Sequence, residues 1–164
     1  MKSRYLSLVF IAASVALASP STANEKYRDA ARQLEREAAV ALDAARIEEA
    51  LTLYERALVA NPANVQVLIG LGRTHEALGR VGRGLKYYRQ ALAVDPNALP
   101  ALEAQAVAFL KRDLVERSEA NREKLARLCP TGCDQLESVE TALEAYKAEK
   151  AAASNMAEAG TGRE

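Results

Sequence analysis

Three evenly spaced prolines, Pro62, Pro96 and Pro130, mark a repeat that constrains this chain more than any other feature of its sequence. The segments LYERALVANPAN (53–64) and YYRQALAVDPNA (87–98) align, so that Pro62 falls on Pro96, and an equal step then reaches Pro130. A fixed period of this length indicates a supersecondary unit that buries its apolar face only by stacking on its neighbours. An ordinary helical bundle with accidental proline spacing is the alternative, and the matching interiors of the two segments argue against it.

The composition agrees with closely packed helices. Apolar residues make up 49% of the 164 residues and aromatic residues only 5%, whereas strands favour β-branched and aromatic side chains. The length fits one domain or one short array of repeats. The 22 basic and 22 acidic residues give a formal net charge of zero. This balance implies neither nucleic acid nor an anionic membrane as a partner.

The repeat resembles the tetratricopeptide family, in which each unit is a helix–turn–helix with the same period that ends in proline. The second unit, 65–98, matches the family pattern most fully, at Leu68, Leu71, Gly72, His75, Gly84, Tyr88, Ala91 and Pro96. The first unit, 31–64, also matches well, but Glu37 stands where the family usually has leucine. The third unit, 99–132, is degenerate, because Arg122 and Leu125 replace the aromatic residue and the alanine of its second helix.

A further helix follows the repeats. Residues 134–149 carry apolar side chains on one side of a helical pattern, at Leu136, Val139, Leu143 and Tyr146. A solenoid needs a terminal element that covers its last apolar face. The resemblance therefore implies an all-α fold, a short α-solenoid of about three helix pairs with a C-terminal capping helix.

The two ends of the chain differ from this middle part. A basic start, the apolar run Leu6–Ala18 and small residues up to Ala23 are typical of a secretory signal peptide over 1–23. The run is shorter than a membrane span, so an uncleaved anchor is the lesser alternative and we expect no stable membrane insertion. We expect an exported, periplasmic protein with a repeat domain over 24–149. Residues 150–164 lack periodicity and predict a disordered tail.

The only two cysteines, Cys129 and Cys133, lie around Pro130 between the third unit and the capping helix. In an exported protein, neighbouring thiols tend to oxidise. We therefore favour a structural disulfide that sets the angle between the third unit and the cap. A redox-active pair would more typically be Cys-x-x-Cys, and zinc would need four ligands. A thiol switch and a metal site stay open as lesser alternatives.

Motifs for catalysis are hard to find. The sequence has no Gly-rich phosphate loop, no nucleophile elbow and no metal-spaced set of His, Cys and Asp. The single histidine, His75, stands where the family usually has a tyrosine between paired helices, so we expect it to serve packing. We expect no enzymatic activity, no cofactor and no metal.

The resemblance also implies a binding surface, because the first helices of successive pairs line a concave groove that receives peptides or partner helices in this family. The residues that it places there are Arg32, Arg36, Gln66, Ile69, Arg73, Glu103 and Val107. The Lys and Asn set with which cytosolic chaperone adaptors of the family hold a C-terminal carboxylate is not reproduced. Arg36 and Arg73 are instead candidates to bind a carboxylate or a backbone carbonyl of an extended ligand. Solubility alone is the other interpretation of these charges.

These observations predict a scaffold or adaptor whose partner is another protein or a peptide. One alternative is a thiol-active assembly factor that uses Cys129 and Cys133. Another is a structural homodimer, because the degenerate third unit could leave apolar surface for a second copy.

Overall fold

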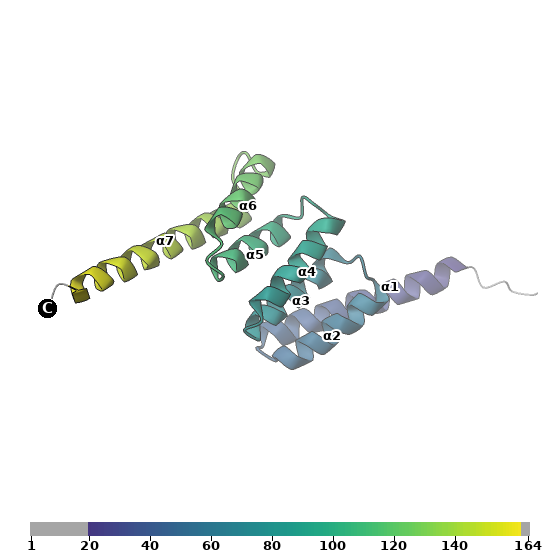
Figure 1. Ribbon diagram of the computed structural model, residues 1–164. Coiled ribbons are helices and arrows are strands. Elements are labelled where there is room, and N and C mark those ends of the chain that lie inside the picture. Colours follow the sequence, from purple (N-terminus) through teal and green to yellow (C-terminus); the bar gives the residue numbers. More distant parts are fainter. Residues whose placement is uncertain (1–19, 162–164) are drawn as a thin grey trace, which may run out of the picture.

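The computed structural model describes residues 20–161, and they form seven α-helices (Figure 1). Three helix–turn–helix pairs follow one another and precede a long last helix, which confirms the predicted all-α array with a C-terminal helix. The helices are α1 (Pro20–Asp43), α2 (Ile47–Ala60), α3 (Val65–Ala77), α4 (Val81–Val94), α5 (Leu99–Leu110), α6 (Val115–Leu128) and α7 (Asp134–Thr161).

The pairs stack so that the two kinds of helix lie on different sides of the array. The first helices α1, α3 and α5 contact one another in sequence, whereas in the described part of the chain the second helices α2, α4 and α6 do not. The first helices therefore line the inner, concave side and the second helices spread apart on the outside (Figure 1). Helix α7 packs on α5 and α6, in the place that the first helix of a fourth pair would take.

Each pair is closed by a turn with one residue in the left-handed region, and this residue recurs at the same place in every repeat. It is Ala45 (φ 57°) in the first pair, Gly79 (φ 71°) in the second and Asp113 (φ 55°) in the third. Glycine adopts this conformation freely, whereas alanine there costs about 1 kcal/mol. The backbone thus keeps the repeat geometry in the third pair, where the sequence pattern is degenerate.

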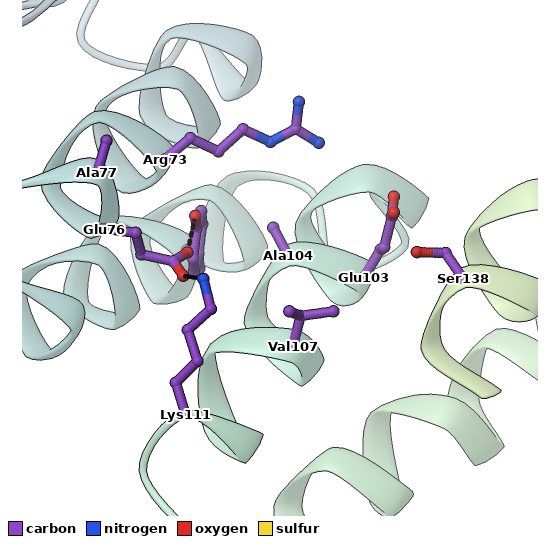
Figure 2. A pocket seen from close by; sticks show the side chains of 9 residues that line it. Arg73, Glu76, Ala77, Glu103, Ala104, Val107, Lys111 and Ser138 are labelled. Carbon is purple, nitrogen blue, oxygen red and sulfur yellow. Dashed lines mark hydrogen bonds and ion pairs between the residues drawn. The ribbon is translucent and has the colours of Figure 1, made fainter. Parts of the chain in front are cut away.

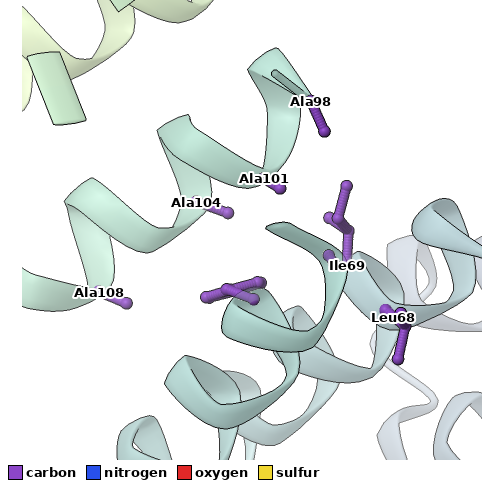
Figure 3. Close-up of a cluster of buried hydrophobic side chains, with 8 residues drawn as sticks. Leu68, Ile69, Ala98, Ala101, Ala104 and Ala108 are labelled. Atoms are coloured by element: carbon purple, nitrogen blue, oxygen red, sulfur yellow. The ribbon is translucent and has the colours of Figure 1, made fainter. Parts of the chain in front are cut away.

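The core consists of three clusters, each formed by one pair and the first helix that follows it. In the middle cluster, Ala98 at the N-cap of α5 and Ala101, Ala104 and Ala108 within α5 face α3 and α4 (Figure 3). Small side chains at this spacing let α5 approach its neighbours closely. In the last cluster, the fully buried Leu125 stands where the earlier pairs have alanine. The larger leucine fills space beside α7, which explains this departure from the family pattern.

Two tyrosines pack against glycine positions of helix α3. The ring of Tyr54 lies on Gly70 of the next pair, and the ring of Tyr88 lies on Gly72 of its own pair. Both tyrosines are buried, and a Cβ atom on either glycine would overlap the ring. These two contacts hold α3 close to the second helices on both sides of it.

The first unit departs from the family pattern where nothing packs against it. Glu37 is exposed and its carboxylate accepts a hydrogen bond of 2.9 Å from Gln33. The equivalent residue of the second unit, Leu71, is fully buried under the first pair. No described helix precedes α1, so a charged residue at this position meets water.

The last helix departs from the pattern for the same reason. Glu140 stands one repeat after the buried Ala106. At this position, the first helix of a pair has a small residue against which its second helix packs. No second helix follows α7 in the described residues, and Glu140 instead pairs with Arg122 of α6 at 3.5 Å. Arg122, which stands in the third unit where the family has an aromatic residue, thus forms an ion pair with α7 at the polar end of the array.

A disordered tail was expected over 150–164, whereas the structure has α7 helical through Thr161; residues 162–164 lie outside the described residues. Between Asp134 and Gly160 this segment holds neither glycine nor proline, and alanine, glutamate and lysine favour helix. Lys150 pairs with Asp113 at 2.6 Å and the Tyr146 hydroxyl donates to the same carboxylate at 2.9 Å. These contacts tie α7 to the α5–α6 turn, and the helix then continues with exposed side chains over 151–156.

The predicted signal peptide falls largely outside the described residues, which include only Pro20 to Ala23 of it, as the start of α1. Within 20–161, none of the helices combines the length and apolar character of a membrane span. Export of the chain therefore stays a prediction.

Substitution of Gly72 by alanine tests the glycine–tyrosine contact. The added methyl group would overlap the buried ring of Tyr88, so we expect Gly72→Ala to lower the free energy of unfolding by about 1–3 kcal/mol. Gly82→Ala is the matched control, because its Cβ would meet only the end of Arg112 at 3.5 Å; alanine there favours helix α4 by about 0.5 kcal/mol. Urea unfolding of both variants gives the comparison, and equal stabilities would contradict the packing account.

Candidate partner-binding groove

Two adjoining hollows lie on the inner side of the array. The larger, of about 470 Å³, lies between α3 and α5 and reaches α7 (Figure 2); its lining residues are Arg73, Glu76, Ala77, Tyr88, Glu103, Ala104, Val107, Lys111 and Ser138. The smaller, of about 270 Å³, lies between α1 and α3. Arg73 lines both hollows, so together they form one groove across the first helices.

The structure brings together six of the seven residues predicted for this groove, namely Arg36, Gln66, Ile69, Arg73, Glu103 and Val107. Arg32 is the exception. It lies on α1, lines neither hollow and pairs with Asp29 one helical turn earlier. Arg32 therefore does not line the groove in this structure, because the ion pair holds its guanidinium group along α1.

Ile69 differs from the other predicted groove residues because it is only 3% exposed. Its side chain belongs to the middle core cluster with Ala98, the N-cap residue of α5, and Ala101 of α5 (Figure 3). Ile69 thus contributes the apolar floor of the smaller hollow, while the exposed neighbour Gln66 lines its rim.

Arg36 and Arg73 are the cations of the groove that no residue within 20–161 pairs. Both side chains are exposed, and neither has an ion-pair partner among the described residues. The carboxylate of Glu35, beside Arg36, instead accepts a hydrogen bond of 2.7 Å from Asn64. Figure 2 shows the Arg73 side chain extended over the larger hollow, toward the side of Glu103. A guanidinium group in this setting can donate two parallel hydrogen bonds to a carboxylate.

A hydrogen-bonded network at the floor of the larger hollow was not predicted. The Tyr88 hydroxyl donates to Glu76 Oε1, and Lys111 Nζ pairs with Glu76 Oε2 at 2.6 Å. Burial, helped by the bond to Glu76, raises the pKa of Tyr88 far above its usual range. The network joins α3, α4 and α5 and satisfies Glu76 within the chain. Its sequence signal is the placement of Glu76 and Lys111 about one repeat apart on successive first helices.

Helix α7 also contributes to the groove, through Ser138. This residue stands one repeat after Ala104, and its hydroxyl points toward Glu103 across the larger hollow (Figure 2). The apolar pattern of 134–149 predicted only a capping helix. The same repeat step that located the units would have indicated that α7 continues the inner row of helices.

Comparison with known proteins agrees with this geometry. A sequence model described as tetratricopeptide repeat matches residues 36–98 and again 69–132, which together make up more than half of the chain. The chain belongs to the tetratricopeptide repeat family. No curated protein matches the chain closely.

Solved tetratricopeptide structures share the fold at low sequence identity. The type III secretion translocator chaperone SycD of Yersinia enterocolitica has a TM-score of 0.66 at 20% identity, covering 74% of this chain and 95% of its own. The first TPR domain of human RPAP3 has a TM-score of 0.63 at 16% identity, covering 73% and 97%. The Sgt2 TPR domain of Aspergillus fumigatus has a TM-score of 0.65 at 23% identity, covering 82% and 83%.

The two cysteines of this tetratricopeptide array lie together, but outside the groove. Their Cα atoms are 5.9 Å apart, within the range of disulfides, and neither residue lines the two hollows. Cys129 ends α6, and the carbonyl of Cys133 accepts a hydrogen bond of 3.1 Å from the Glu137 amide in the first turn of α7. The pair therefore connects the last repeat to the capping helix.

His75 is a buried residue of the second tetratricopeptide pair. It is 4% exposed, and its ring stacks on Tyr87 with the centroids 5.3 Å apart and the planes inclined by 10°. Its Nδ1 atom has no hydrogen-bond partner within the described residues. Burial, with the charges of Arg83 and Arg80, holds the pKa of His75 below its usual value. The described residues hold no cluster of three or more potential metal ligands that could include it.

The lowered pKa of His75 predicts a stability loss in mild acid. The unfolded chain binds a proton to this histidine near its ordinary pKa of about 6.5, whereas the folded chain resists protonation until a lower pH. Stability is therefore complete above about pH 6.5 and falls as the pH drops from there toward the folded-state pKa. Urea midpoints at pH 7.5 and 5.5 measure the loss. His75→Gln should reduce this difference, and an unchanged pH dependence in that variant would exclude His75 as its source.

Proposed function

We propose that this protein is a non-catalytic interaction module that holds a peptide or a partner helix in its inner groove. The observation that carries the proposal is the pair of adjoining hollows along the first helices, where exposed Arg36 and Arg73 have no ion-pair partner within residues 20–161. Solved structures of the same fold support it, because SycD has been solved in complex with a peptide of the translocator YopD. The first TPR domain of Spaghetti (RPAP3) has been solved with an HSP90 peptide.

The groove also suggests the chemistry of its ligand. Arg73 lies where the two hollows meet, so a ligand running along the groove passes its guanidinium group. An acidic side chain or a terminal carboxylate would supply the missing counter-charge. The apolar floor of Ala104 and Val107 beside it would receive a small apolar side chain of the same ligand.

We further propose that the module acts in the periplasm after cleavage of the leader. The apolar run near the start of the chain and the pair Cys129 and Cys133, whose thiols would tend to oxidise in an exported protein, support this location. Cell fractionation with detection of the shortened chain would test it, and a full-length protein in the cytoplasm would contradict it.

The groove is tested with a photo-crosslinking residue at Gln66, and with one at Arg56 of α2 as an exposed control outside both hollows. A partner captured from Gln66 alone identifies the ligand. Its affinity should then fall about tenfold or more in Arg73→Glu, because the substitution removes a charge-assisted contact and adds repulsion. The thermal unfolding midpoint should not change, since Arg73 is exposed. Equal affinities of Arg73→Glu and Arg56→Glu would contradict the assignment.

A thiol-active assembly factor is the second candidate, favoured by the close approach of Cys129 and Cys133. We propose instead that the two form a structural disulfide that braces α7 against α6. The bond would close a loop of about five residues, which corresponds to about 2 kcal/mol of stability in the loop-entropy model.

The double variant Cys129→Ser, Cys133→Ser separates these two roles. A structural bond predicts a free energy of unfolding lower by about 2 kcal/mol and an unchanged affinity of the folded groove for its ligand. Addition of a reductant to the native protein should reproduce the loss of stability. A variant of native stability that has lost its cellular activity would support the thiol-active alternative.

A further inference from the structure

The outer side of the array carries a basic face, although the formal net charge of the whole chain is zero. It comprises six cationic residues of α4, the turn before it, the α5–α6 turn and the first turn of α6: Arg80, Arg83, Lys86, Arg89, Arg112 and Arg117. All six side chains are exposed. Between Glu76 and Asp95 every charged residue is basic, so α4 holds no acidic residue that could neutralise them.

None of these six cations forms an ion pair among the described residues, although other exposed cations of the chain do. Two nearby carboxylates are engaged elsewhere, with Glu76 bound to Lys111 and Asp113 bound to Lys150. Glu55, which acts on His75 together with Arg80 and Arg83, and Glu116, beside Arg117, form no ion pair with the six cations. Helix N-termini also favour acidic side chains, yet the first turn of α4 has only Arg83 as a charged residue. The basic face therefore presents six cations to solvent without an ion pair to any described residue.

Part of the basic face surrounds a small hollow. Arg89, Arg112 and Arg117 line a depression of about 190 Å³ together with Phe109, and the Arg117 guanidinium lies 5.7 Å from the centre of the Phe109 ring. Arg83 and Arg117 stand one repeat apart, at equivalent places of successive second helices. The charges thus follow the outer helices across two pairs, and several can meet the same anionic partner.

We propose that this basic face docks the protein peripherally on a bilayer that contains anionic phospholipid. The position of the face supports a broad partner that covers the outer side, because α4 is the middle helix of that side, where the second helices spread apart (Figure 1). An extended acidic peptide would be held better by the inner groove than by a convex surface. Arginine binds phosphate through two parallel hydrogen bonds, and each cation near an anionic surface adds to the attraction. Docking in this way leaves the groove on the other side accessible.

Vesicle co-sedimentation tests the docking surface, with phosphatidylcholine alone compared with phosphatidylcholine that contains about one third phosphatidylglycerol. We expect binding to the anionic vesicles only, with a steep loss between about 50 and 200 mM salt, since the attraction between exposed charges is screened. The triple variant Arg83→Glu, Lys86→Glu, Arg89→Glu should lower the partition coefficient at least about tenfold.

The matched control is Arg28→Glu, Arg56→Glu, Arg127→Glu, which changes the net charge equally through three exposed arginines outside the basic face. It should retain most of the binding. Circular dichroism should show native helix content in both variants, because all substituted side chains are exposed. Equal losses in the two triple variants, or no binding of the native protein to anionic vesicles, would overturn the proposal. Binding to the polyanion heparin without binding to vesicles would also overturn it, in favour of a different anionic partner.

Discussion

The contact between a tyrosine ring and a glycine in a neighbouring helix is the constraint on which this structure depends. Tyr54 on Gly70 and Tyr88 on Gly72 bring α3 close to the second helices of two pairs. At equivalent positions of the third pair, Ala104 and Ala106 retain the small size that close packing needs. Because each contact joins neighbours only, the array is held by a chain of local interfaces rather than by one central core.

This mode of stacking gives the molecule two unlike faces. The first helices converge and form a groove with Arg73 at its middle, while the second helices diverge and carry the cations of α4 outward. Charges inside the groove are of both signs, and Glu76 is already bound by Tyr88 and Lys111. We infer a division of roles, with peptide or helix recognition on the inner side and attachment to an anionic surface on the outer side.

The departures from the family pattern have physical explanations at the two ends of the array. Glu37 is tolerated because no helix covers that side of α1, and Glu140 because no partner helix follows α7 in the described residues. Leu125 is a true core residue, whose extra volume packs beside the capping helix. The third unit is therefore degenerate only as a sequence. Its helices and its left-handed turn residue match those of the other pairs.

The sequence by itself predicted the array of helix pairs and a set of seven residues of which six line the two inner hollows, because the constant repeat step places equivalent residues on equivalent helices. That these residues bind a partner stays a prediction. Only the tertiary structure decided which charges remain free. Ion pairs such as Lys111 with Glu76 and Arg32 with Asp29 depend on side-chain directions that periodicity does not specify. Only the tertiary structure, too, placed Ile69 in the core and Ser138 in the groove, since burial depends on how closely the next helix approaches.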